Sequence, residues 1–257
     1  MSTGRRKLLL ACGFETGLLA LAFLIFAAGK DQYAVRARRV ITLLMITESL
    51  VLALAPVFAV RKAAGRSVLE SLLMTLRPVG WTLAVTLAGP LVLALVFDRG
   101  ALPGWIMAKL ICAAIGMASA GLVLFITRLT GRPALSLPLS LVLILGFSLQ
   151  PFYTMPVIRA LRGKPEAQKL LIDSGVRAPW MAASHAMLSA GPAGWKYMPV
   201  TSPYLYEHWV GTDYPVNVPG NGSYLIEYLV FGLLLAGLAA LFPRKTAPRE
   251  VAPTVDN

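Results

Sequence analysis

Long apolar runs separated by short charged segments make up most of the chain. A helix needs about 20 such residues to cross the ~30 Å hydrocarbon core of a bilayer. The runs are too long for the strands of a membrane barrel and lack their strict alternation. We therefore predict an all-α polytopic membrane protein, a single membrane domain with six transmembrane helices. The predicted spans lie at about 8–28, 40–60, 79–97, 105–127, 134–158 and 223–242.

A charged segment at 61–78 separates the second and third predicted spans. Basic residues come first, and apolar residues then recur at the spacing of one helix face, with Glu70 on the other side. This pattern predicts an amphipathic helix between two spans, with a surface that can meet lipid or a soluble protein. The residues that define it are Arg61, Lys62 and Arg66, followed by Val68, Leu69, Leu72, Leu73 and Leu76.

The long segment at 159–222 is the second distinctive region. Pro151 and Pro156 lie close together at the end of the fifth span and are expected to end its helix. A possible amphipathic helix follows at 165–172, and then a stretch rich in proline, tryptophan and tyrosine. Aromatic rings suit the membrane–water interface. We predict an outer loop whose interfacial helices cap the mouth of the bundle, and a surface that recognises a substrate or partner is the alternative.

The chain carries 24 lysines and arginines against 12 acidic residues, a net charge of +12. These charges lie at span ends, where they contact anionic head groups, so they indicate membrane lipids rather than nucleic acid as partners. With the N-terminus inside, the predicted cytoplasmic segments hold twelve basic residues and the short outer loops hold six. This bias predicts a protein integral to the cytoplasmic (inner) membrane with both termini in the cytoplasm. The six in the outer loops are Lys30, Arg36, Arg38, Arg39, Arg99 and Lys109.

The order of these elements resembles that of the membrane subunits of ABC-2-type transporters, and the resemblance covers nearly the whole chain. Between spans 2 and 3 that family carries an acidic-basic run, then Gly-Thr-Leu-Glu-Leu-Leu and a Thr-Pro-Leu turn. Here Ser67-Val68 replaces the Gly-Thr pair, and Arg61 and Lys62 replace the preceding acidic residues. The matching segments are Ala55-Pro56, Arg66 to Thr75, Gly100 to Gly104 and Thr127 to Arg132, with a large outer loop before span 6 and a basic tail.

The resemblance implies a permease that forms half of a translocation pathway and pairs with a second permease, identical or related. It also implies that the helix between spans 2 and 3 rests in a groove of a cytoplasmic ABC ATPase, which binds ATP and Mg. This chain would then hold no cofactor, and the helix would transmit the motion of the ATPase to the spans. The residues assigned to that coupling contact are Arg66, Leu69, Glu70, Leu72, Leu73 and Leu76.

The chain's own motifs are consistent with a non-catalytic subunit. No Gly-x-x-x-x-Gly-Lys-[Ser/Thr] occurs in the sequence, and Gly163-Lys164 lacks both the upstream glycine and the following hydroxyl residue. The two histidines, His185 and His208, are far apart, and we see neither a nucleophile triad nor metal-ligand spacing. We therefore expect ATP hydrolysis on a separate chain.

Glu48 is the deepest acidic residue in the predicted spans and is flanked by Thr47 and Ser49. An ionisable group at such a depth is costly and usually faces a bundle interior or water. Two readings stay open. These three residues line the pathway or the seam between two permeases, or Glu48 is a hydrogen-bonded structural glutamate. Glu227 lies nearer the outer face, and we expect it to reach the interface.

Two other functions compete with the permease. One is a non-transporting membrane scaffold or assembly factor that uses the outer loop to hold a partner. The other is a secondary transporter with Glu48 as its ion site, although the chain shows no repeat between its halves and no paired broken helices.

Overall fold

The computed structural model describes residues 33–59, 66–189, 204–212 and 214–242. The predicted all-α class is confirmed over these residues, in which no strand occurs. The elements are α2 (Tyr33–Leu54), η1 (Ala55–Ala59), α4 (Val68–Val85), α5 (Ala88–Phe97), η2 (Arg99–Ala101), α6 (Leu102–Thr130), α7 (Pro133–Ala160), α8 (Pro165–Gly175), α9 (Pro179–Ser189), η4 (Tyr204–Val210) and α10 (Asn221–Ala240).

Five helical units of the described residues are long and apolar enough to cross a membrane. They overlap the predicted spans 2 to 6, whereas the predicted first span at 8–28 lies outside the described residues. Because α4 and α5 together form one of them, that unit is interrupted within its length. The five units are Tyr33–Ala59, Val68–Phe97, Arg99–Thr130, Ala134–Ala160 and Asn221–Ala240.

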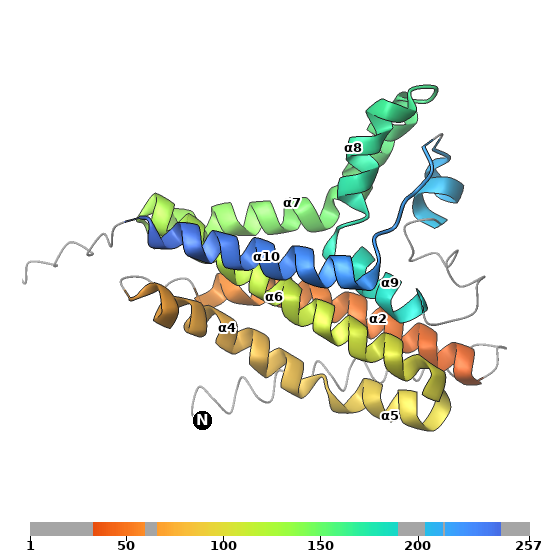
Figure 1. Cartoon of the computed structure of the whole chain (residues 1–257), viewed down its shortest axis with the longest axis horizontal. Helices are drawn as coiled ribbons and strands as arrows, with labels where there is room; N and C mark the ends of the chain where they lie inside the picture. The colour runs from red at the N-terminus through yellow and green to blue at the C-terminus, as the bar shows by residue number, and fades with distance from the viewer. Residues whose placement is uncertain (1–32, 60–65, 190–203, 213, 243–257) are drawn as a thin grey trace, which may run out of the picture.

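Helix α6 is the centre of the bundle and packs against α2, α4, α7, α9 and α10 (Figure 1). Small residues let its neighbours approach closely. A Cβ atom added to Gly121 would lie 2.2 Å from the carbonyl oxygen of Gly232 on α10, and one added to Gly232 would lie 2.7 Å from the carbonyl oxygen of Met117. The backbones of α6 and α10 are therefore in direct contact, which fixes the two spans to each other.

Helix α4 joins the predicted surface helix to the predicted third span without a break. Its start is fixed by a capping box, in which the Ser67 hydroxyl accepts a hydrogen bond from the Glu70 amide and the Glu70 carboxylate accepts one from the Ser67 amide, both at 3.2 Å. Pro78 lies inside the helix, where it removes one backbone hydrogen bond and does not end the helix. The amphipathic segment is thus the first part of a unit that is long and apolar enough to cross a membrane.

Helix α7 continues to Ala160 although Pro151 and Pro156 are expected to end it. Pro151 has no amide hydrogen to bond to the carbonyl of Phe147, which weakens the helix at this turn. The indole Nε1 of Trp180 donates a hydrogen bond of 2.9 Å to the carbonyl of the next residue, Ser148. Contacts from outside the helix therefore stabilise the proline-containing turn, and Figure 1 shows α7 leaving the bundle beside α8.

Helices α8, α9 and η4 lie toward the end of the bundle where α2 begins and α5 ends (Figure 1). Helix α9 is buried over most of its length and packs against α2 and α6. A separate apolar cluster joins the end of α7 to α8, α9 and η4. Its large side chains that are almost completely buried are Ile158, Ile172, Met181 and Tyr206.

Candidate functional site

The break between α4 and α5 follows from the position of one proline. In a continuous helix the carbonyl of Thr86 would accept a hydrogen bond from the amide of residue 90. That residue is Pro90, which has no amide hydrogen, so the Thr86 carbonyl loses its intrahelical partner. Helix α4 accordingly ends at Val85, and α5 begins at Ala88. The unit Val68–Phe97 thus has a backbone carbonyl without a helical partner within its apolar length.

Lys109 of α6 supplies the missing hydrogen bond. Its ammonium Nζ lies 2.9 Å from the Thr86 carbonyl oxygen and 2.7 Å from the Thr86 hydroxyl oxygen. A backbone carbonyl in a bilayer costs several kcal/mol when it is left unbonded, which is why such gaps are filled from neighbouring helices. Lys109 therefore stabilises the break and binds α6 to it.

Glu48 of α2 neutralises this lysine. Both of its carboxylate oxygens lie 2.6 Å from Lys109 Nζ, and one of them also accepts a 2.6 Å hydrogen bond from the Thr86 hydroxyl. The side chains of Glu48 and Lys109 are 2% and 11% exposed. Three spans thus meet at one buried ion pair, whose desolvation cost is offset by the surrounding hydrogen bonds.

A second ion pair on α2 gives a reference point for the position of the first along that helix. Arg38 of α2 donates to both carboxylate oxygens of Asp98, which follows α5, at 2.7 and 3.1 Å. Glu48 comes ten residues after Arg38 in α2, a distance of about 15 Å along the helix. That is roughly half of the ~30 Å hydrocarbon core. If Arg38 and Asp98 lie at the membrane surface, the Glu48–Lys109 pair lies near the middle of the bilayer.

The structure brings Glu48 into this cluster but not its two predicted companions. The hydroxyls of Thr47 and Ser49 donate to carbonyls of their own helix, at 3.0 and 2.7 Å. The contacts of Glu48 favour the reading of a hydrogen-bonded structural glutamate. Lys109 and Thr86 were missed as site residues from the sequence, where Lys109 was counted with the outer loops. A proline four residues after Thr86 was the available signal.

The predicted coupling residues divide into two faces of α4. Leu69 and Leu73 are 67% and 60% exposed. Leu72 packs against the cluster of Leu124, Ala236 and Ala239, and Leu76 packs against the main core. The carbonyl of Arg66 accepts a hydrogen bond from Arg128 at the end of α6, and Glu70 serves the capping box. An apolar surface of two leucines therefore remains exposed at the start of a membrane-spanning unit.

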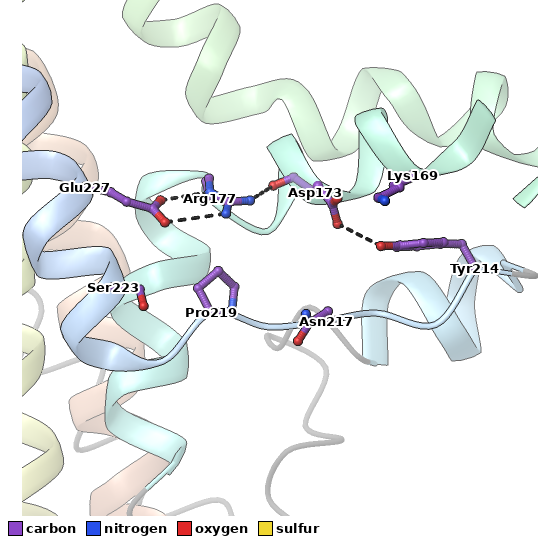
Figure 2. Close-up of a pocket in the computed structure, with 8 residues that line it drawn as sticks. All are labelled: Lys169, Asp173, Arg177, Tyr214, Asn217, Pro219, Ser223 and Glu227. Atoms are coloured by element: carbon purple, nitrogen blue, oxygen red, sulfur yellow. Dashed lines mark hydrogen bonds and ion pairs between the residues drawn. The ribbon is translucent and has the colours of Figure 1, made fainter. Parts of the chain in front are cut away.

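A polar cavity of about 330 Å³ lies between α8, the segment 214–219 and the first turns of α10 (Figure 2). Arg177 crosses one side of it, donating 2.8 Å from Nε to Glu227 and 2.5 Å from Nη1 to the Asp173 carbonyl. The hydrogen bond and the negative charge of Glu227 raise the pKa of Arg177 against the opposing effect of burial. Glu227, expected to reach the interface, is 42% exposed and is part of this ion pair.

Comparisons of the chain with protein-family models, with curated proteins and with solved structures find no match in any of the three. Within the described ranges, no three His, Cys, Asp or Glu side chains lie close enough together to hold a metal ion. Function is therefore inferred from the geometry of the broken span, the start of α4 and the polar cavity.

Proposed function

We propose that the protein is the permease subunit of an ATP-binding-cassette transporter, moved by a separate cytoplasmic ATPase that carries ATP and Mg. The supporting observation is the start of α4. Leu69 and Leu73 form an exposed apolar surface on a capped helix that continues, without interruption, into a membrane-spanning unit. A soluble protein that binds this surface has a rigid element through which to act on the membrane domain.

The motion would reach the bundle through two contacts. Helix α4 is 18 residues long, about 27 Å, and ends at the break beside Thr86. Leu72 near its start packs against residues of α6 and α10. Lys109 holds its far end against α6 and, through Glu48, against α2. Movement of the α4 start would therefore displace α6 and α10, with the ion pair acting as the fixed point at the break.

The orientation with both termini in the cytoplasm belongs to the same proposal. The starts of α4 and α7 and the end of α6 share one end of the bundle (Figure 1). Arg66, Arg128 and Arg132 belong to these segments, as the positive-inside rule requires of a cytoplasmic face. Because Lys109 is buried in α6, it leaves the six basic residues counted in the outer loops and five remain. A second permease, identical or related, would complete the pathway.

The test is the double variant Leu69→Asp/Leu73→Asp, compared with Leu170→Asp. Leu170 is a 76% exposed leucine of α8, outside the membrane-spanning units, and is the matched control. Two carboxylates in an apolar groove would cost several kcal/mol, so the double variant should lose at least tenfold in ATPase recovery. The measurement is co-purification of a Walker-motif ATPase from the native cells, together with ATP hydrolysis by the complex. The thermal midpoint of the permease checks that each variant is folded.

The outcome that contradicts the proposal is equally specific. Wild-type recovery of the ATPase with Leu69→Asp/Leu73→Asp, or an equal loss with Leu170→Asp, would show that the α4 start does not bind the ATPase. The non-transporting scaffold would then be the better function. That second candidate is favoured by one observation, namely that the contacts of Glu48 hold three spans together.

A further inference from the structure

The polar cavity beside α10 is lined by charges of alternating sign. Lys169, Asp173 and Arg177 follow one another at four-residue spacing, so they share one face of α8 and of the turn after it. Figure 2 shows this row facing the segment that carries Tyr214 and Asn217. With Glu227, the lining holds two cations and two anions. A cavity without net charge does not concentrate a simple anion or cation, but it matches a ligand that carries both signs.

Part of this lining has no partner among the residues that the structure describes. Arg177 is held by Glu227 and by the Asp173 carbonyl, and the Tyr214 hydroxyl lies 3.4 Å from one carboxylate oxygen of Asp173. The side chains of Lys169 and Asn217, by contrast, make no hydrogen bond or ion pair with any residue that the structure describes. An ammonium, an amide and a carboxylate edge therefore face the cavity with bonding capacity to spare.

The α8 side of the cavity is anchored to the helices on either side of it. The Tyr224 hydroxyl of α10 donates 2.8 Å to the Val176 carbonyl, and the Tyr228 hydroxyl donates to the carbonyl of Arg177. On the other side of α8, Gln150 of α7 donates 2.9 Å to the Ser174 hydroxyl. Anchoring this side of the cavity lowers the ordering cost of binding, as in preorganised sites.

The position of the cavity selects the source of its ligand. Ser223 and Glu227 reach it from α10, and the same helix face continues with Val230 and Leu234 at the next helical positions. Val230 and Leu234 are 47% and 61% exposed, as lipid-facing residues of a span are. A molecule with its polar group in the cavity can therefore lay hydrocarbon chains along the same side of α10.

We propose that this cavity binds a phosphate that carries a primary ammonium, the headgroup of a phosphatidylethanolamine lipid. Lys169 and Asn217 donate to the phosphate oxygens, while Asp173 and Glu227 accept hydrogen bonds from the ammonium. A quaternary ammonium has no N–H to donate, and a purely anionic headgroup would place its charge beside two carboxylates. This site does not depend on the proposed transport function.

The test is lipid binding to the full chain in detergent, followed by native mass spectrometry. Phosphatidylethanolamine, phosphatidylcholine and phosphatidylglycerol with identical acyl chains are titrated separately. We expect phosphatidylethanolamine to bind roughly fivefold or more tightly than the other two, the ratio that one partly exposed ion pair supplies. Lys169→Gln and Asp173→Asn should each remove this preference. Lys164→Gln and Glu166→Gln, which remove the same charges outside the cavity, should keep it.

Two further measurements keep the result decisive. Lys169→Arg retains the charge, so it should retain the preference for phosphatidylethanolamine if Lys169→Gln acts on the ligand and not on folding. Thermal midpoints check the fold of each variant. Soluble glycerophosphoethanolamine should compete only at concentrations at least a hundredfold higher, because it lacks the acyl chains. Equal binding of the three lipids, an equal loss with Lys164→Gln, or competition by the soluble compound at lipid concentrations would overturn the proposal.

Discussion

The ammonium of Lys109 donates a 2.9 Å hydrogen bond to the backbone carbonyl of Thr86, the group that Pro90 leaves without a helical partner. The contact connects a local property of the chain, a proline four residues after a threonine, to the packing of three spans. It also explains why a costly buried charge is present in an apolar region, since the lysine satisfies a backbone group that would otherwise face hydrocarbon.

The first prediction concerns the ion pair itself. Lys109→Met removes the counter-charge of Glu48 and the donor to Thr86, and we expect a loss of about 3–5 kcal/mol in unfolding free energy. Lys109→Met/Glu48→Leu should recover most of this loss, because no buried carboxylate then remains. The measurement is a double-mutant cycle of unfolding in one detergent. Equal losses for the single and double variants would mean that the pair contributes through packing alone.

The second prediction concerns the proline at the break. Pro90→Ala returns an amide hydrogen that can bond to the Thr86 carbonyl, so the cluster becomes less dependent on Lys109. In a Pro90→Ala background, the loss of unfolding free energy caused by Lys109→Met/Glu48→Leu should be about 1 kcal/mol smaller than in the wild-type background. This difference is the net contribution of one hydrogen bond. Pro138→Ala in α7 is the control and should leave that cost unchanged. If this loss is the same in both backgrounds, Pro90 is not the reason that the Thr86 carbonyl needs Lys109.

The third prediction concerns the crossing of α6 and α10. Gly121→Ala places a methyl group where the Gly232 carbonyl lies, so we expect a loss of about 1–3 kcal/mol as the two backbones separate. Gly237→Ala on α10 has no atom within 4 Å of the added methyl group and should be neutral or stabilising by about 0.5–1 kcal/mol. Thermal midpoints of the two variants make the comparison, and similar values would argue against the close crossing.

The fourth prediction concerns acid sensitivity. Burial lowers the pKa of His185 in α9, whose ring packs against that of Tyr224. At pH above the ordinary value of about 6.5 the histidine is neutral in both states and contributes nothing. Below that value the unfolded chain takes up the proton first, so stability falls by up to about 1.4 kcal/mol per pH unit until the folded histidine also titrates.

The measurement for His185 is the thermal midpoint at pH 7.5 and at pH 5.5. His185→Gln should lose less stability than the wild type between these two values, because it removes the titrating group. An identical pH dependence for both proteins would assign the acid sensitivity to other residues.

Hydropathy was enough to predict an all-helical structure whose helices are long and apolar enough to cross a bilayer, because this property depends on the sequence and not on helix packing. Helix α6 extends from Leu102 to Thr130 around the predicted span at 105–127. The capping box at Ser67 and Glu70 could also be found in the sequence, since a serine followed three residues later by a glutamate is its signature.

The broken span could not be predicted in this way. A hydropathy average over the run at 79–97 is insensitive to one missing amide hydrogen, and only the structure shows that the missing bond is replaced from another helix. The partners Glu48 and Lys109 are 61 residues apart, and their meeting depends on how α2, α5 and α6 pack. Helix continuity across Pro78 and Pro151 depends in the same way on neighbouring helices, which a local rule for proline does not include.

The separation of Glu48 and Lys109 along the chain has a consequence for how the protein is made. At about 5–20 residues per second, a ribosome adds the 61 residues between them in roughly 3–12 seconds. During that interval α2 holds a carboxyl group whose lysine has not yet been synthesised, and a charge at the centre of an inserting helix costs about 2.5–3.5 kcal/mol. Helix α2 therefore bears this cost alone until α6 is synthesised, and we expect nascent chains that stop before Lys109 to insert less stably than chains that include it.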